Sequence, residues 1–300
     1  MWTMTVAALA LSAASPECGA GVAFPVAEIH AHHVYVLALV EGREARLILD
    51  TGASTTLDSA FAGQVGLATR AGEPGQGAGE GTVAVRRADV AITLAGARMR
   101  DTGVAVVPLS GVARAEGRRV DGILGGTLFG RCVVVIDYAR GTVRLAAPAA
   151  YRPPAGWTRV PLERDGDLVF ARAAITPRPG AAPVTGWYEI DSGGGHAVIL
   201  NAPFVARHAL AAGAATDTAA MAGVGGVARA AHGRVASLRL GGRGFPDVPA
   251  LLSTAASGMT ASAEFDGNIG GALLERLGAV AFDYPHRRMW VAPPAHPPPG

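Results

Sequence analysis

The sequence predicts an all-β protein made of two similar lobes, and three observations lead to this prediction. Several landmarks of the first half recur in the same order in the second half. The chain holds 41 glycines and 20 prolines among its 300 residues, which favours short strands and many turns over long helices. Each half also contains one apolar run that ends on an aspartate followed by small residues. Together these features indicate a duplicated β-rich unit.

The duplication rests on four landmarks with a nearly constant offset. The stretch LILDTGAST around Asp50 returns as YEIDSGGGH around Asp191, 141 positions later. VDGILGG from Val120 returns as FDGNIGG from Phe265, and VAITLAG returns as ASLRLGG, at offsets of 145 and 146. An aspartate follows the Gly-Gly segment in each half. These two residues, Asp137 and Asp283, are 146 positions apart. We therefore predict an N-terminal lobe over 24–150 and a C-terminal lobe over 151–300, the latter with a Pro-rich tail.

Within the first lobe, apolar runs around short turns predict hairpins. Val34–Val40 and Ala45–Leu49 flank a turn at 41–43, two further strands lie within 86–109, and 131–145 turns near 139–141. Helical signals are brief: one follows Asp58, and the others are TLFGR and its second-lobe counterpart GALLERLG.

Composition excludes several classes of function. All 26 basic residues are arginine, so Schiff-base catalysis, a lysine general base and a phosphate-loop lysine are excluded. The net charge of +2 gives no reason to expect a nucleic-acid partner. We expect no metal site at His30, His32 and His33, because no acidic or cysteine cluster accompanies them at ligand spacing and a solvated segment explains them. No cofactor is expected.

The N-terminus predicts export. Residues 1–23 contain a short apolar stretch followed by small residues, which is typical of a signal peptide cleaved after Ala20 or Ala23. A periplasmic or secreted protein without stable membrane insertion is therefore expected. Such cleavage would remove Cys18, so Cys132 is expected to be a buried, unpaired thiol.

The two aspartates are the candidate catalytic residues. In each half a strand delivers Asp50 or Asp191 into a tight turn, where glycine lets backbone amides approach the carboxylate. Two lobes packed about an approximate twofold axis would bring both carboxyls together. Two such groups share one proton, and so supply a general base and a general acid in one place. A Ser192–His196–Asp191 triad is discounted because all three residues lie on one short loop.

These motifs resemble the pepsin-type and retroviral-type aspartic proteases. LILDTGAS followed by GILGGTLF resembles the Asp-Thr/Ser-Gly turn and the later hydrophobic-hydrophobic-Gly element of that family. The resemblance implies a two-lobed pepsin/retropepsin-like β-barrel (acid protease) fold, a water between Asp50 and Asp191, and an extended peptide substrate. It also implies that six residues lock the loops together and form their turns: Thr51, Gly52, Ala53, Ser192, Gly193 and Gly194. It implies that six further residues support these loops: Ile123, Leu124, Gly125, Asn268, Ile269 and Gly270.

Departures from the family pattern carry two expectations. Asn268 replaces an apolar residue of the supporting element, so a weakened second lobe is an alternative. Ala53 and Gly194 lack the hydroxyl that in pepsin-like members donates to the carboxylate and lowers its pKa. An activity optimum at mildly acidic to neutral pH is therefore predicted.

Flaps over the substrate are predicted in the glycine-rich stretches 72–85 and 222–233, because a mobile hairpin needs glycine. The alternative is two ordinary surface loops. The candidate flap residues are Gly75, Gly77, Gly79, Gly225 and Gly226.

The predicted function is an aspartic endopeptidase that acts as a monomer on peptide or protein substrates. Two alternatives remain open: a non-catalytic peptide-binding module that keeps the protease cleft, and a processing protease with one dedicated substrate.

Overall fold

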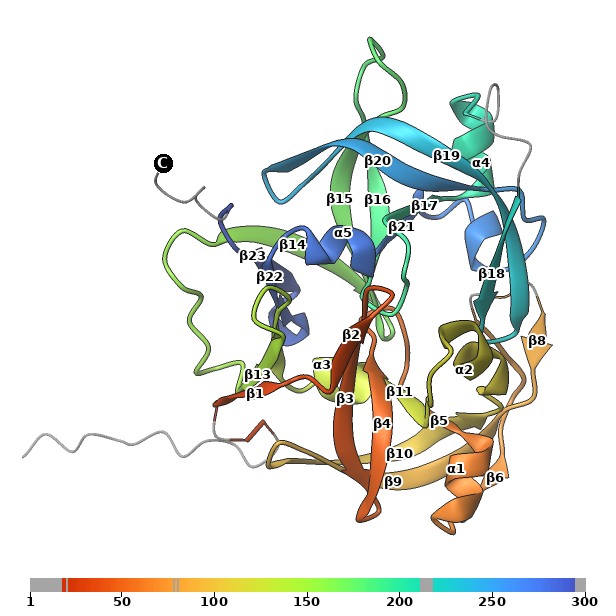
Figure 1. Ribbon diagram of the computed structural model, residues 1–300, viewed down its shortest axis with the longest axis vertical. Coiled ribbons are helices and arrows are strands. Elements are labelled where there is room, and N and C mark those ends of the chain that lie inside the picture. The colour runs from red at the N-terminus through yellow and green to blue at the C-terminus, as the bar shows by residue number, and fades with distance from the viewer. Residues whose placement is uncertain (1–17, 20, 78, 80, 211–217, 295–300) are drawn as a thin grey trace, which may run out of the picture.

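The computed structural model describes residues 18–19, 21–77, 79, 81–210 and 218–294. Most of the predicted leader (1–17 and 20) and the end of the Pro-rich tail (295–300) lie outside the described residues. Strands dominate the two lobes, which lie one above the other in Figure 1. The first-lobe elements are β1 (Ala23–Pro25), β2 (Glu28–His30), β3 (His33–Val40), β4 (Arg43–Leu49), β5 (Thr56–Asp58), α1 (Ser59–Gln64), β6 (Arg70–Ala71), β7 (Gly75–Gln76), β8 (Thr82–Val83), β9 (Arg86–Leu94), β10 (Ala97–Val107), α2 (Ser110–Glu116), β11 (Gly122–Leu124), α3 (Gly126–Phe129), β12 (Val133–Asp137) and β13 (Thr142–Ala146).

The second lobe repeats this order after the connection that contains Tyr151. Its elements are β14 (Thr158–Asp165), β15 (Leu168–Thr176), β16 (Val184–Asp191), β17 (Val198–Leu200), α4 (Ala202–Arg207), β18 (Thr218–Gly223), β19 (Gly226–Leu240), β20 (Arg243–Ser253), the 3₁₀ turn Met259–Ala261, β21 (Gly267–Gly270), α5 (Gly271–Glu275), β22 (Ala279–Asp283), the 3₁₀ turn Tyr284–His286 and β23 (Arg288–Val291).

The strand pairings confirm the predicted duplication. In the first lobe the order β3-β4-β11-β5-β10-β9 closes into a barrel, because β3 also pairs with β9. In the second lobe β15-β16-β21-β17-β20-β19 closes in the same way through β15 and β19. A shared sheet, ordered β1-β13-β12-β22-β23-β14, joins the two barrels. The fold is therefore the predicted two-lobed, all-β acid protease fold.

Alternating burial explains why these segments form strands. Val34, Val36, Ala38 and Val40 of β3 are fully or nearly fully buried, whereas Leu37 and Leu39 face outward. The β3–β4 turn uses positive φ at Glu41 (48°) and Gly42 (77°), which suits a tight hairpin.

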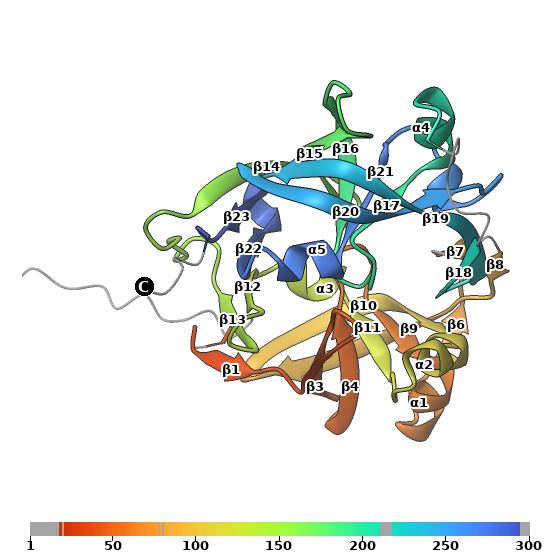
Figure 2. The ribbon, with the colours of Figure 1, turned by 45° about the horizontal axis from the view of Figure 1, so that its top comes forward.

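Short helices cap the ends of the strands. Asp58 caps α1 by accepting from the backbone N–H groups of Ala60 and Phe61, as expected from the signal after Asp58. The predicted helical segments TLFGR and GALLERLG form α3 and α5. Figure 2 shows these two helices between the barrels, next to the segments that carry the aspartates.

The structure corrects the expectation for Cys132. Cys132 forms a disulfide with Cys18, which ties the segment before β1 to the end of α3 across 114 positions. The sequence did not predict this bond because it assigned Cys18 to a cleaved leader. Cleavage after Ala20 or Ala23 would remove the bond, and the leader itself stays a prediction.

Candidate active site

The two Asp loops interlock through buried hydroxyls. Thr51 donates its Oγ1–H to the carbonyl of Ile190 at 2.8 Å and accepts from the Ser192 N–H at 2.8 Å. Ser192 mirrors this, because its Oγ–H donates to the Leu49 carbonyl at 2.9 Å and accepts from the Thr51 N–H at 3.1 Å. Four hydrogen bonds with approximate twofold symmetry therefore hold the two loops together.

This interlock brings Asp50 and Asp191 together. A methyl group at Gly193 would overlap the Asp50 carboxyl, and one at Gly52 would lie 2.9 Å from Cγ of Asp191. Each carboxyl thus lies against the glycine of the opposite loop, which places the two carboxyls close enough to affect each other's pKa. Glycine is required at both positions because any side chain would occupy the space of a carboxyl.

The two carboxyls have different hydrogen-bond partners. Asp50 accepts from the Gly52 N–H at 2.7 Å. Asp191 accepts from the Gly193 N–H at 2.9 Å and from Nδ2 of Asn268 at 2.9 Å. Burial, followed by the negative charge of Asp191, raises the pKa of Asp50 well above its ordinary value. The pair therefore favours one shared proton, with Asp50 as its holder.

The supporting elements lie directly behind the loops. In the first lobe Leu124 accepts from the Asp50 N–H at 3.2 Å, and the Gly126 N–H donates to Ala53 at 3.0 Å. In the second, the Gly271 N–H donates to the Gly194 carbonyl at 2.6 Å. The remaining predicted residues of these elements are also buried: Ile123 lies in the parallel pairing β4–β11, Ile269 and Gly270 lie in the pairing β16–β21, and Gly125 directly follows β11.

The two candidate flaps meet each other. The Gly79 N–H donates to the Val224 carbonyl at 3.0 Å, and the Gly81 N–H donates to the Gly225 carbonyl at 3.0 Å. A side chain at Gly77 would lie 2.7 Å from Cβ of Val224. Figure 2 shows β18 beside the short β7–β8 hairpin that contains Gly75.

Both candidate flaps pack on the first lobe. Val83 on β8 and Val224, in the turn between β18 and β19, contact an apolar cluster that contains Ile48 and Ile123. Since Ile48 lies two residues before Asp50 on the same strand face, this cluster flanks the dyad. Turning through Gly225 and Gly226 uses φ values of 88° and 111°, which only glycine adopts readily.

Sequence reasoning missed three side chains around the loops. Tyr284 donates its hydroxyl to the Thr51 carbonyl at 2.7 Å. His33 is buried, not solvated as expected, and its Nδ1 lies 3.0 Å from Oε2 of Glu116. Burial lowers the pKa of His33, but Glu116, the charge of Asp191 and the Gly193 backbone raise it, and the net shift is upward. No local motif marks these long-range contacts.

Glu189 is the third missed side chain. It is only 5% exposed and follows the strand alternation that also buries Ile48 in the first lobe. Nδ2 of Asn268 donates to Oε2 of Glu189 at 3.0 Å. Burial, followed by the charge of Asp191, raises the pKa of Glu189 to about 8. The repeat could have signalled it, because an acid stands where the first copy has isoleucine.

Other residues that the sequence brought forward have structural partners. Nε2 of His196 is 2.6 Å from Oδ1 of Asn268, while Ser192 is engaged in the loop interlock, so the discounted triad does not form. Asp121 and Asp266 accept from the backbone N–H groups of Arg46 and Trp187, and so anchor equivalent strands. Among the described residues, no group of three or more His, Cys, Asp or Glu could hold a metal ion.

The interlocked loops and paired barrels define the acid protease class of protein. Residues 36–128 match the family model for aspartyl proteases. This match lies within the first lobe, and the matched family is one of the pepsin/retropepsin-like clan. No curated protein matches the chain. The family supports a protease function in general and peptide substrates. No described helix has both the length and the apolar character needed to cross a membrane.

Proposed function

We propose that the protein is an aspartic endopeptidase that hydrolyses peptide bonds with a water molecule activated between Asp50 and Asp191. The observation that supports this most directly is the packing of each carboxyl against the glycine of the opposite loop. Thr51 and Ser192 act as positioning residues, because their hydrogen bonds fix the separation of the two loops.

The hydrogen bonds suggest a division of roles. Asp191 accepts two N–H groups from other residues, which favours its ionised form, so it is the general base that takes a proton from water. The water oxygen bonds to the carbonyl carbon. Asp50 holds the proton that donates to the developing oxyanion. A proton then passes to the leaving nitrogen, the carbon–nitrogen bond breaks, and the products are a carboxylic acid and an amine.

A substrate peptide would lie beneath the flaps. Because Gly79 and Gly81 are bonded to Val224 and Gly225, these contacts must open before a chain can enter. Both aspartates belong to one polypeptide, so a monomer suffices for the reaction. The Cys18–Cys132 disulfide favours an oxidising compartment, because such bonds persist there, and it requires that the chain is not cleaved after Ala20 or Ala23.

The test is incubation of the purified protein with a mixed peptide library across pH, with and without a pepstatin-type inhibitor. Cleavage should be inhibited, and Asp50→Asn and Asp191→Asn should each abolish it. Asp165→Asn is the matched control, because Asp165 is an exposed carboxyl on β14 and should retain full activity. Peptide binding without turnover by the unaltered protein would overturn the proposal in favour of a binding module. Cleavage of one sequence alone would indicate a dedicated processing protease.

A further inference from the structure

The pseudosymmetry of the site fails at one pair of positions. In the first lobe, Ile48 on β4 is the register partner of Ile123 on β11. In the second lobe, the same positions of β16 and β21 hold Glu189 and Asn268, which are again register partners. An apolar pair beside Asp50 thus corresponds to a polar pair beside Asp191. Burying polar groups costs free energy unless they form hydrogen bonds, so the buried Glu189–Asn268 pair must have hydrogen-bond partners.

Asn268 is the centre of a hydrogen-bonded network. Its amide group donates to Oε2 of Glu189 at 3.0 Å and to Oδ2 of Asp191 at 2.9 Å. Its Oδ1 lies 2.6 Å from Nε2 of His196. Because both amide hydrogens are used on the carboxyls, Oδ1 must accept, and His196 therefore carries a hydrogen on Nε2. This arrangement fixes the orientation of the amide.

Glu189 faces the catalytic loop of the opposite lobe. Its Oε1 would lie 3.0 Å from a Cβ at Gly52, so it points at the turn that follows Asp50. The charged and titratable groups that act on it or lie next to it are Asp191, Asp50, the Tyr284 hydroxyl and, through Asn268, His196. No cation is among them, so a charge on Glu189 is disfavoured and its proton is retained to about pH 8.

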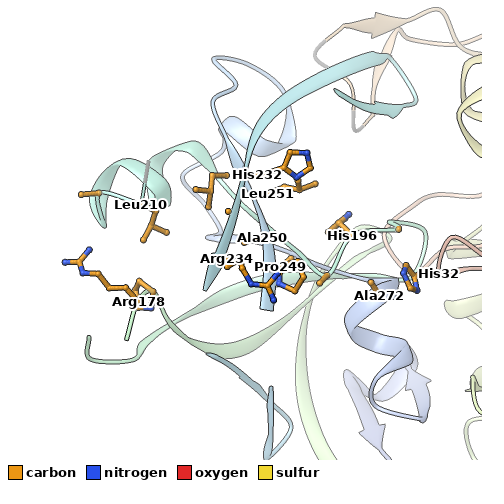
Figure 3. Close-up of a pocket in the computed structure, with 17 residues that line it drawn as sticks. His32, Arg178, His196, Leu210, His232, Arg234, Pro249, Ala250, Leu251 and Ala272 are labelled. Carbon is orange, nitrogen blue, oxygen red and sulfur yellow. The ribbon is translucent and has the colours of Figure 1, made fainter. Parts of the chain in front are cut away.

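His196 connects this network to the outer side of the second lobe. Burial lowers the pKa of His196, so the ring is neutral at neutral pH. It lines a cavity of about 860 Å³ together with His32 and His232, as Figure 3 shows, and this cavity contains neither aspartate. The network thus runs from the dyad to a surface that protons can reach.

We propose that Asn268 and Glu189 are positioning residues for the dyad: Asn268 fixes Asp191 as the ionised base, and Glu189 is a third carboxyl that holds a proton beside it. This inference rests on the proposed protease function and goes beyond it. Protonated Glu189 keeps the cluster of three carboxyls at a single negative charge. When Glu189 ionises, its charge raises the affinity of Asp50 for a proton, so Asp50 remains an acid at higher pH.

The kinetic test compares pH–rate profiles of Glu189→Gln and Asn268→Leu with the unaltered protein. Glu189→Gln keeps the shape but not the charge, so the alkaline limb of the profile should move to lower pH. Asn268→Leu should lower kcat by about 10- to 100-fold with little change in KM, the loss expected for one hydrogen bond to a charged group. Glu163→Gln removes an exposed carboxyl from β14 and should leave the profile unchanged. An unmoved limb in Glu189→Gln would overturn the proposal.

A second measurement does not depend on turnover. With ¹³C-labelled carboxyl groups, one glutamate signal should titrate near pH 8 and vanish in Glu189→Gln. The signal of Asp50 can be assigned by its absence in Asp50→Asn. In Glu189→Gln this Asp50 signal should titrate at lower pH than in the unaltered protein. These titrations in a protein that cleaves no peptide would support the network and reject the protease function. Peptide cleavage by a protein in which Glu189 titrates at its ordinary pKa of 4.5 would support the protease function and reject the network.

Discussion

Replacing Glu189 by glutamine should make the protein more stable at alkaline pH and leave its stability unchanged at acidic pH. The pKa of this carboxyl is 4.5 in an exposed chain and about 8 in the fold, a difference of about 3.5 units (8 − 4.5). Between these values the folded state binds a proton that the unfolded state releases. The contribution of Glu189 to the free energy of unfolding is therefore fully present below pH 4.5 and is lost as pH rises through 8.

The magnitude follows from about 1.4 kcal/mol per pKa unit, which gives an upper limit of about 5 kcal/mol. Part of the shift belongs to Asp191, with which Glu189 interacts, so the measured value should fall below this limit. Glutamine imitates the protonated side chain and has no such pH dependence.

The assay is urea unfolding of the unaltered protein and Glu189→Gln at pH 5 and pH 8. The difference in unfolding free energy should be about 1 kcal/mol at pH 5 and reach several kcal/mol in favour of the variant at pH 8. Glu163→Gln controls for the loss of one surface carboxyl. Parallel pH dependences in the variant and the unaltered protein would refute the argument, since they would show that Glu189 ionises equally in both states.

Three further outcomes are expected. Thr51→Val should lower the unfolding free energy by about 2–4 kcal/mol, because the Ile190 carbonyl and the Ser192 N–H lose their buried partner; Thr51→Ser should restore most of it in the same urea titration. Cys132→Ser should cost about 2–5 kcal/mol, and reductant should shift the melting temperature of the unaltered protein but not of the variant. Peptide cleavage should be fastest at mildly acidic to neutral pH, because burial and Asp191 keep the Asp50 pKa well above its ordinary value; an optimum near roughly pH 2, where pepsin-type pairs work, would contradict this.

Most of the fold could be predicted from the internal sequence repeat. Apolar alternation and Gly-containing turns identified the β3–β4, β9–β10 and β12–β13 hairpins, since these are local patterns. Helices α2 and α4 were not predicted. The N-cap residue of α2, Leu109, makes no side-chain capping bond, whereas α4 begins at Asn201-Ala202-Pro203, a helix-start signal that could have been used.

The candidate site was only partly predictable, because local motifs mark loops but not their neighbours. Asp50 and Asp191 stand in recognisable turns, and the structure brings them together. Cys18 and Cys132 are 114 positions apart, so their bond depends on the packed fold. Glu189 looks like an outward residue on a strand until its register partner Asn268 is known. The polar pair is visible only when the two copies are compared position by position.

The exchange of Ile48 and Ile123 for Glu189 and Asn268 makes the two halves chemically inequivalent. Two identical halves would hold a proton on either acid with equal probability, and only a bound ligand could make the two acids different. In this chain the amino-acid sequence itself makes them different before any ligand binds. A chain built from two copies of the first half should still interlock its loops, yet it would have no inherent direction for proton transfer.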